Sequence, residues 1–325
     1  MSRVVILGGS GFVGRSLCEQ ISAHASLSGA RVVVPSRRRE RAKHLFTLPR
    51  VDVIQADVHR ETDLQRVLAG ADVVVNLVAI LHGTSEAFEQ AHVTLVQRLV
   101  QACAKAGVRR VIHVSALGVP DDPAQAPSIY LTTKAEGEQT LREAEAAGLL
   151  DVTVLRPSVI FGEHDRFLNL FAQLQAVAPF MPLAGADARF QPVWVEDVAR
   201  ALVACLLDAA TAGQTYECAG PKVLTLAELV RLAGQGSGHR RWVLPMPMAV
   251  GRLQAAAMAF LPGEPLMSKD NLDSMQVPNV ATGQKPGLAA LGITPASPEV
   301  IAPQYLNRAG DWSRRLDLFR SLAGR

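Results

Sequence analysis

The chain has 325 residues, 49% of them hydrophobic and 19% charged, which is enough to form one large α/β domain or a core with a smaller lobe. Its formal net charge of +3 is too small to indicate nucleic-acid binding, and no arginine-rich helix with interleaved aromatic residues accompanies it. The cysteines lie far apart without C-x-x-C spacing, so neither a metal site nor a disulfide framework is indicated. We find no signal segment and no uncharged apolar run long enough to span a membrane, and therefore expect a cytoplasmic protein.

The chain opens with an apolar run, 4–7, that breaks into glycines at three-residue spacing. This pattern predicts a strand, a tight turn and a helix: Gly8 allows the turn, Gly11 lets backbone approach a pyrophosphate, and Gly14 lets the helix pack closely. The helix N-terminus would then hold the anion. The alternative is a purely structural turn. The predicted dinucleotide contacts are Gly8, Ser10, Gly11, Phe12, Val13 and Gly14. The G-x-x-G-x-x-G spacing resembles the extended and atypical short-chain dehydrogenase/reductases.

Short runs of β-branched residues alternate with helical patterns along the first half of the chain. Strands are expected at 4–7, 31–34, 51–55, 73–78, 110–114 and 152–155. This alternation predicts an α/β fold with a doubly wound parallel sheet, the Rossmann fold. Helices are expected over 62–68, opened by a Thr62-x-x-Gln65 capping box, and over 87–106.

The end of the second predicted strand bears on the choice of dinucleotide. An NAD site usually places a carboxylate there to accept from the ribose 2′-hydroxyl, but this chain has no carboxylate before Glu40. Arg37 can hold a 2′-phosphate with a planar fork of donors, and Ser36 can add a hydroxyl. We therefore predict that NADP(H) is preferred, with NAD(H) as the alternative cofactor. The other interpretation is a solvated basic helix start.

Two further strand ends are expected to line the dinucleotide. Asp57 and Val58 follow the third strand, where the carboxylate could accept a hydrogen bond from the adenine amino group or cap a helix instead. An apolar segment follows the fourth strand and would lie along the ribose and diphosphate, unless it is only a buried strand terminus. Its residues are Leu77, Val78 and Ala79.

Tyr130 and Lys134 stand four residues apart, which places both side chains on one helix face. A nearby ammonium favours the phenolate and should lower the pKa of the tyrosine, so that Tyr130 can act as general acid and base. The pair resembles the Tyr-x-x-x-Lys motif of the same reductase family. That resemblance implies that Lys134 also holds the nicotinamide ribose and that both residues contact the cofactor.

The resemblance also implies a catalytic hydroxyl after the serine that ends the fifth strand, and this chain has Ala116 at that position. Either Ser115 reaches the substrate instead, or the hydroxyl that would polarise a carbonyl is absent and turnover is poor or lost. His92 stands where extended members of the family commonly carry a helix asparagine.

The stretch from Leu155 to Asn169 makes the resemblance more specific. Its Arg-Pro-x-x-x-x-Gly segment is similar to one whose backbone faces the nicotinamide carboxamide, which implies cofactor contacts at Pro157 and Val159. Together with the blocks at 191–198 and 265–272, it resembles the nucleotide-binding accessory subunit of respiratory complex I and its bacterial relatives. That resemblance implies an NADPH that is bound structurally and lies off the electron path.

The last third of the chain should form a smaller C-terminal lobe. We expect residues 1–162 to form the dinucleotide-binding core, and 163–325 to supply remaining core elements at about 190–218 and the lobe. Thr225 and Glu228 form a capping box that opens a helix. The apolar segment 242–262 is interpreted as a buried lobe helix, with an amphipathic surface for a membrane or a respiratory complex as the alternative. The latter would place the protein at the inner face of the membrane.

Two classes of function therefore stay open. One is a nicotinamide-dependent reductase, epimerase or dehydratase of a small carbonyl or sugar-nucleotide substrate, with Tyr130 as acid and base and Lys134 as its helper. The other is an NADPH-binding accessory or sensor protein. Ala116 favours the second class, and the intact Tyr130 and Lys134 favour the first.

Overall fold

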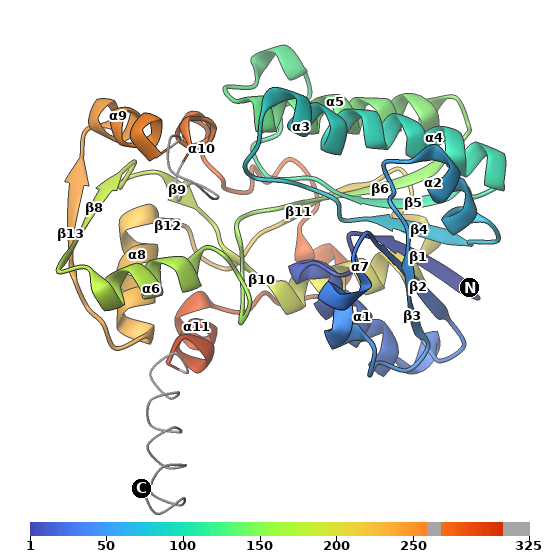
Figure 1. Cartoon of the computed structure of the whole chain (residues 1–325), viewed down its shortest axis with the longest axis horizontal. Coiled ribbons are helices and arrows are strands. Elements are labelled where there is room, and N and C mark those ends of the chain that lie inside the picture. Colours follow the sequence, from blue (N-terminus) through green and yellow to red (C-terminus); the bar gives the residue numbers. More distant parts are fainter. Residues whose placement is uncertain (259–267, 308–325) are drawn as a thin grey trace, which may run out of the picture.

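A seven-stranded sheet forms the centre of the computed structural model, which describes residues 1–258 and 268–307. The strand order is β11-β6-β5-β4-β1-β2-β3, and every neighbouring pair is parallel (Figure 1). The strands are β1 (Arg3–Leu7), β2 (Arg31–Ser36), β3 (Val51–Gln55), β4 (Val73–Asn76), β5 (Arg110–Val114), β6 (Asp151–Pro157) and β11 (Thr215–Cys218). The predicted α/β fold is confirmed.

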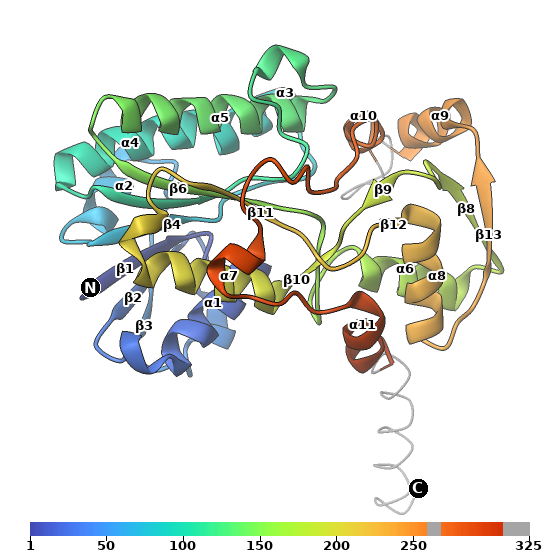
Figure 2. The ribbon, with the colours of Figure 1, turned by 180° about the vertical axis from the view of Figure 1, so that it is seen from behind.

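Helices cover both faces of this sheet, which explains why its inner strands are continuous apolar runs. Val4 and Ile6 pack with α1 (Phe12–Ala23) and α7 (Val195–Leu207) on one face. Val5 and Leu7, the alternate side chains of the same strand, pack on the opposite face, which a second layer of helices covers (Figure 2). Those helices are α2 (Glu61–Leu68), α4 (Leu95–Ala106) and α5 (Ile129–Ala146).

Two predicted helix starts have different outcomes. The Thr225 capping box is confirmed, because its side chain and that of Glu228 both make the expected bonds at the start of α8 (Leu226–Gly236). The box at Thr62 is wrong. Helix α2 begins at Glu61, and the nearby Asp63 carboxylate instead accepts the backbone N–H of Asp57 at 2.9 Å.

The helix expected over 87–106 is built in three parts. It begins as α3 (Ser85–Glu89), passes through a π-helical turn at Gln90–Thr94 and continues as α4. A Cβ atom on Gly137 of α5 would lie only 2.3 Å from the carbonyl oxygen of His92, so this glycine admits the bulging turn. Such turns occur frequently at functional sites.

The small lobe has its own hydrophobic core. It contains the strand pairs β7 (Ile160–Phe161) with β10 (Val193–Trp194), β9 (Arg189–Phe190) with β12 (Leu224–Thr225), and β8 (Phe180–Ala184) with β13 (Trp242–Met246). Its other helices are α6 (Leu168–Val177), α9 (Met248–Met258), α10 (Lys269–Ser274) and α11 (Pro298–Leu306). Between these elements the chain returns to the large sheet through α7 and β11.

The segment 242–262 is not the buried helix that we expected. Residues 242–246 form β13, and only then does α9 begin, because Pro245 and Pro247 cannot continue a helix. Trp242 is 82% exposed and Leu253 is 73% exposed. Residues 259–262 of this segment, and 265–267 of the block 265–272, lie outside the described residues. None of the described helices combines the length and apolar character needed to span a bilayer.

Asp165 ties together three elements of the small lobe and explains part of the stretch from Leu155 to Asn169. Its buried carboxylate accepts the backbone N–H groups of Gly162, Phe167 and Asn169 at 2.9, 2.8 and 3.1 Å. It also accepts the hydroxyl of Tyr305 on α11 at 2.9 Å. One side chain thus fixes the end of β7, the start of α6 and the last described helix.

We expect Asp165→Asn to lower the free energy of unfolding by about 2 kcal/mol, because an amide group directs protons at donors that the carboxylate now satisfies. Tyr305→Phe removes one of the four bonds and should cost about 1 kcal/mol. Urea unfolding of both variants measures whether Asp165→Asn lowers the stability more than Tyr305→Phe does. Equal stability of Asp165→Asn and the wild type would contradict it.

Candidate functional site

The turn between β1 and α1 has the geometry expected of an anion site. Gly8 has a φ of +79°, and a Cβ atom there would lie 3.0 Å from the backbone of Leu77. A Cβ atom on Gly14 would lie 2.4 Å from the Cα of Gly9, so the helix packs directly on the turn. Gly11 is the N-cap of α1 and supplies no side-chain bond, which leaves the first N–H groups of the helix, at 12–14, to a ligand.

A positively charged corner lies beyond the ends of β2 and β3. Arg37 is exposed, and its guanidinium makes no hydrogen bond or ion pair to the described residues. The Ser36 hydroxyl donates to the carbonyl of Arg38 at 3.0 Å and shapes the turn. Burial lowers the pKa of His59, and Arg37 lowers it further although Asp57 acts in the opposite direction. A 2′-phosphate at this corner would therefore meet the positive charge of Arg37.

The other predicted cofactor segments lie along the same edge of the sheet. Asp57 accepts the backbone N–H of His59 at 3.1 Å, so it shapes its own turn whether or not it meets adenine. Leu77 bonds to Leu7 of β1, and the N–H of Val78 donates to the side chain of Asn76 at 3.2 Å. The partly exposed stretch 77–79 thus borders the glycine turn, at the crevice where open parallel sheets bind ligands.

Tyr130 lies in the first turn of α5, and the small lobe caps that turn. Asp270 of α10 accepts the backbone N–H groups of Ile129 and Tyr130 at 2.7 and 3.2 Å. Burial and the charge of Asp270 raise the pKa of Tyr130. The expected lowering by Lys134 is therefore wrong for this structure: the carboxylate opposes ionisation of the phenol, and the Lys134 ammonium donates to the carbonyl of Val114 at 3.1 Å.

Lys134 is a buried cation that forms no ion pair with the described residues. Only 2% of the residue is exposed, and burial lowers its pKa to about 8 although the charge of Glu138 raises it. Glu138 itself is held by Arg156, with N···O distances of 2.7 to 3.2 Å. Glu138 therefore does not neutralise the Lys134 ammonium, which could donate to a ribose hydroxyl. Burying this unpaired charge lowers the stability of the folded protein.

That cost predicts a pH dependence. Between pH 8 and 10.5 the unfolded chain binds a proton at residue 134 that the folded chain releases, so the free energy of unfolding rises with pH in this window. Lys134→Met should stabilise the protein by about 3 kcal/mol below pH 8 and lose this advantage toward pH 10.5. The same variant should bind NADPH more weakly. Urea unfolding across this pH range measures the difference, with the exposed Lys43→Met as the control. A difference that stays constant with pH would contradict the prediction.

Ala116 lies beside Tyr130 in a small apolar cluster with Leu131 and Ala135. No hydroxyl is therefore presented from residue 116. Ser115 is 4% exposed, and its Oγ has no hydrogen-bond partner among the described residues. The serine is enclosed between the sheet and its helices, which weakens the interpretation that it reaches a substrate in place of residue 116.

A buried polar layer lies beneath this site, and the sequence analysis identified only His92 of its members. His92 accepts the backbone N–H of Ile80 at 3.2 Å, lies 3.0 Å from the hydroxyl of Thr133, and presents its ring edge-on to Tyr130 at 5.5 Å. Asn76 bonds to His113 at 3.1 Å. Burial and the charge of Lys134 lower the pKa values of His92 and His113 to about 2 and 3, so both rings stay neutral. Polar residues inside the apolar strands at 73–76 and 110–114 were the available signal.

The predicted contact at Val159 is already occupied in this structure. Asn279, from the loop after α10, accepts the N–H of Val159 at 2.9 Å and the hydroxyl of Ser158 at 2.7 Å. Its amide nitrogen donates to the carbonyl of Leu117 at 3.1 Å. Asn279 thereby joins the ends of β5 and β6, and Pro157 is buried next to this junction. A cofactor that used the N–H of Val159 would have to displace Asn279.

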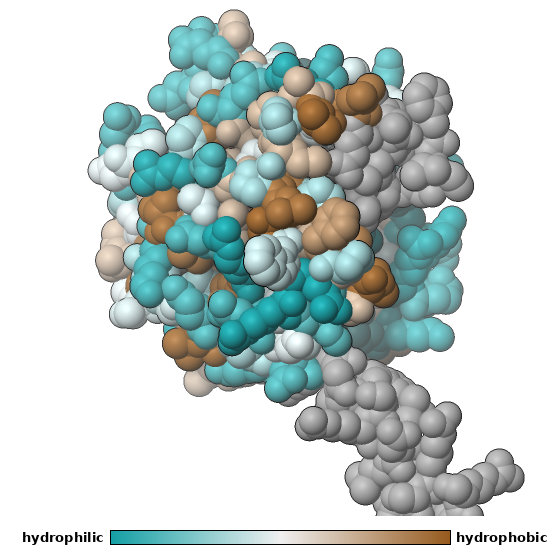
Figure 3. All heavy atoms as spheres, turned by 90° about the vertical axis from the view of Figure 1, so that its left-hand side faces the viewer, coloured by the Kyte–Doolittle hydropathy of each residue, from teal (hydrophilic) through white to brown (hydrophobic). Residues whose placement is uncertain are grey.

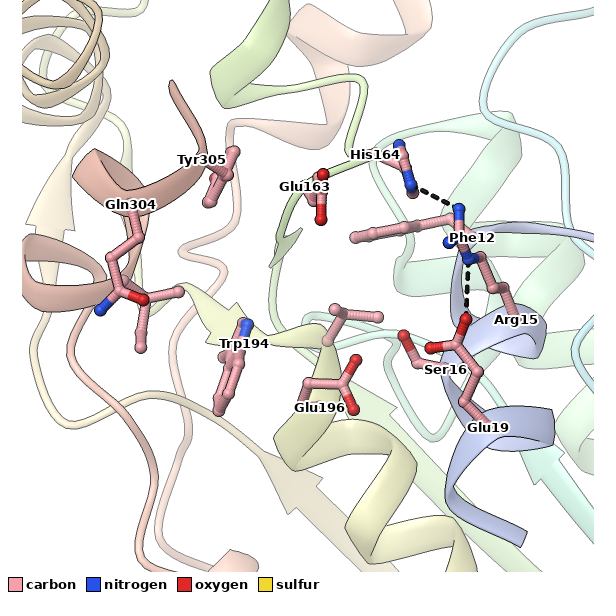
Figure 4. A pocket seen from close by; sticks show the side chains of 12 residues that line it. Phe12, Arg15, Ser16, Glu19, Glu163, His164, Trp194, Glu196, Gln304 and Tyr305 are labelled. Atoms are coloured by element: carbon pink, nitrogen blue, oxygen red, sulfur yellow. Dashed lines mark hydrogen bonds and ion pairs between the residues drawn. The ribbon is translucent and has the colours of Figure 1, made fainter. Parts of the chain in front are cut away.

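A cavity of about 200 Å³ lies between α1, the start of α7 and α11, away from Tyr130 and Lys134. Figure 4 shows the ring of Phe12 and the side chains of Trp194 and Tyr305 around it. Arg15 bridges Glu19 and His164 at its rim. The side chain of Phe12 thus faces this cavity, while its backbone belongs to the glycine turn.

Comparison with known proteins supports the dinucleotide site. The model of the NAD dependent epimerase/dehydratase family matches residues 4–219. NADH dehydrogenase [ubiquinone] 1 alpha subcomplex subunit 9 of Mus musculus is 29% identical over 93% of this chain and 79% of its own length. The Arabidopsis thaliana protein of the same name is 32% identical over 79% of this chain and 63% of its own.

Among solved structures, the dTDP-glucose 4,6-dehydratase of Streptomyces venezuelae, with NAD and TYD bound, superimposes with a TM-score of 0.65. It shares 24% identity and covers 75% of this chain and 84% of its own. At this identity the likeness establishes the fold alone.

Proposed function

Because the chain belongs to the NAD dependent epimerase/dehydratase family, we propose that it binds NADP(H) and holds it mainly for structure or sensing, with weak or no turnover. The observation that carries this proposal is Ala116, whose methyl group packs beside Tyr130 where the family resemblance implies a hydroxyl. The environment of Tyr130 adds support, because burial and the charge of the Asp270 cap raise the pKa of the tyrosine that would exchange the proton.

The cofactor preference rests on the corner beyond β2. Exposed Arg37 and nearby His59 present donors where a 2′-phosphate would lie, and the chain has no carboxylate between Ser36 and Glu40. A ribose 2′-hydroxyl would find no carboxylate acceptor between Ser36 and Glu40. NADP(H) therefore fits this corner better than NAD(H).

Assembly with a respiratory complex forms the second part of the proposal. The Mus musculus and Arabidopsis thaliana relatives are named as subunits of NADH dehydrogenase [ubiquinone], and the mouse protein aligns with 93% of this chain. We place the protein in the cytoplasm, at the inner face of the membrane that carries such a complex.

A second candidate function is favoured by the intact Tyr130 and Lys134. Their side chains lie on one face of α5, with Lys134 bonded at the end of β5. In this alternative the protein is an NAD(P)-dependent reductase, epimerase or dehydratase of a small carbonyl or sugar-nucleotide substrate.

Identifying the dinucleotide tests the proposal directly. Acid extraction of the purified protein should release NADP(H). If NADPH binds only the folded state, a concentration of about 100 times its dissociation constant should add roughly 2.7 kcal/mol to the free energy of unfolding. Urea unfolding with NADPH and with NADH measures this gain. An unfolding transition that neither dinucleotide changes would contradict the proposed cofactor site. A larger gain in stability with NADH than with NADPH would contradict the proposed preference for NADP(H).

A further inference from the structure

The small lobe exposes hydrophobic side chains where its parallel strands β8 and β13 begin. Trp242 is 82% exposed, and Phe180, its neighbour across the strand pair, is 49% exposed. Val177 at the end of α6 and Leu244 on β13 are 82% and 44% exposed. We call these four residues the apolar tip. Figure 3 faces the lobe from this side and shows brown hydrophobic side chains among teal polar ones.

Strand geometry explains which side chains point outward. Met181 and Leu183 on β8 are buried in the lobe core, so their neighbours Phe180 and Pro182 face the opposite way. At the far end of the same face, Ala184 is covered by α9, since a Cβ atom on Gly251 would lie 2.2 Å from the Ala184 methyl group. No described residue covers the end of this face that carries the apolar tip. Contiguous exposed apolar groups of this kind mark interaction sites.

The segments that build the apolar tip carry charges of one sign. Arg240 and Arg241 directly precede Trp242, and Arg240 is exposed. The sequence contains no aspartate or glutamate between Glu228 and Glu264, or from 166 to 186. Glu228 lies at the other end of the lobe, where the first turn of α8 bonds to the carbonyls of Ala186 and Ala188. The tip therefore combines an exposed tryptophan with arginines and has no neighbouring carboxylate in the segments that build it.

We propose that the apolar tip docks on an anionic lipid surface, with Trp242 and Phe180 at the depth of the headgroups and the exposed Arg240 on lipid phosphates, while Arg241 donates to the carbonyl of Gln175 at 2.9 Å and adds its positive charge from behind. Tryptophan favours the membrane interface, and arginine extends its charge to the headgroups while its methylene groups stay among apolar atoms. A second copy of this chain fits less well, because a two-fold contact would bring the arginines of both copies together. The surface lies on the lobe, so the inference goes beyond the dinucleotide site.

Cosedimentation of the full chain with lipid vesicles tests the proposal. The probes are vesicles of phosphatidylcholine alone and vesicles that also contain phosphatidylglycerol. Binding should require the anionic lipid and fall as salt rises. Trp242→Ser should weaken it by at least about tenfold, because the indole loses its burial. Arg240→Gln should weaken it by about fivefold on anionic vesicles.

Leu149→Ser is the matched control, because Leu149 is 47% exposed in the turn between α5 and β6, on the large domain. It should bind vesicles like the wild type. Absence of vesicle binding, or equal binding by all variants, would overturn the proposal. A wild-type dimer that Trp242→Ser dissociates, without vesicle binding, would assign the tip to a second copy and also overturn it. Unfolding with NADPH, measured on the same variants, reports separately on the proposed function.

Discussion

Arg37→Asp should weaken NADPH binding by at least about a hundredfold and change NADH binding much less. A guanidinium can donate two charge-assisted bonds to a phosphate, each worth roughly 1.5 to 3 kcal/mol. A tenfold change in affinity corresponds to about 1.4 kcal/mol. Arg37 is exposed, and no described residue pairs with it, so its replacement should cost the fold little. The introduced carboxylate could also accept from the 2′-hydroxyl of NADH.

Calorimetric titration of both dinucleotides measures this effect. Arg39→Asp is the matched control, because the Arg39 guanidinium lies over the ring of Phe46, 5.7 Å from its centroid. The control should keep most of its NADPH affinity. A wild-type preference for NADH, or an equal loss in Arg37→Asp and Arg39→Asp, would refute the role of Arg37.

Six of the seven strands of the large sheet could be predicted from the sequence because each is a local pattern, whereas β11 was expected only within the remaining core elements at about 190–218. Buried parallel strands need continuous apolar runs, and turns such as Gly8 need a residue that tolerates positive φ, so both leave a mark within a few positions. The boundaries were less certain, as the false capping box at Thr62 shows: Asp63 bonds to Asp57 in the preceding turn, and a helical pattern does not reveal that competitor.

The contacts between the two halves of the chain could not be predicted, because they join residues that are far apart in sequence. Asp270 reaches Tyr130 across 140 positions, and Asn279 reaches Val159 across 120. Nothing local in either segment indicates its target. A buried helix was preferred over an exposed surface for the segment that begins at Trp242 for a related reason, because an apolar segment indicates burial unless the neighbouring strand and the free face are known.

The same long-range contacts shape the expectation for catalysis. Tyr130 and Lys134 are present, but residue 116 offers a methyl group, and the carboxylate of Asp270 opposes ionisation of the phenol. Losing one donor that stabilises a developing charge commonly costs about 10² to 10³ in rate. We therefore expect the wild type to bind NADPH but to oxidise it slowly or not at all with generic carbonyl and sugar-nucleotide substrates.

Restoring the hydroxyl should reverse part of this loss. Ala116 packs within the cluster that contains Leu131, so Ala116→Ser places an oxygen next to Tyr130 with little change in volume. Stopped-flow absorbance of NADPH should show oxidation faster by about 10² to 10³ in this variant for a carbonyl substrate that the site admits. The double variant Ala116→Ser with Tyr130→Phe should return to the wild-type rate, because the added donor needs the tyrosine to move the proton.

Binding measurements separate this loss of chemistry from a loss of cofactor. Tyr130→Phe should leave NADPH affinity nearly unchanged, whereas Lys134→Ala should weaken it, since we expect the ammonium to hold the ribose whether or not chemistry follows. Fast turnover by the wild type that Tyr130→Phe abolishes would refute the accessory role and establish the enzyme. Ala116→Ser would then be expected to change the rate little, because a site that already turns over has another group to polarise the carbonyl. The buried hydroxyl of Ser115 is the nearest candidate for that group along the chain.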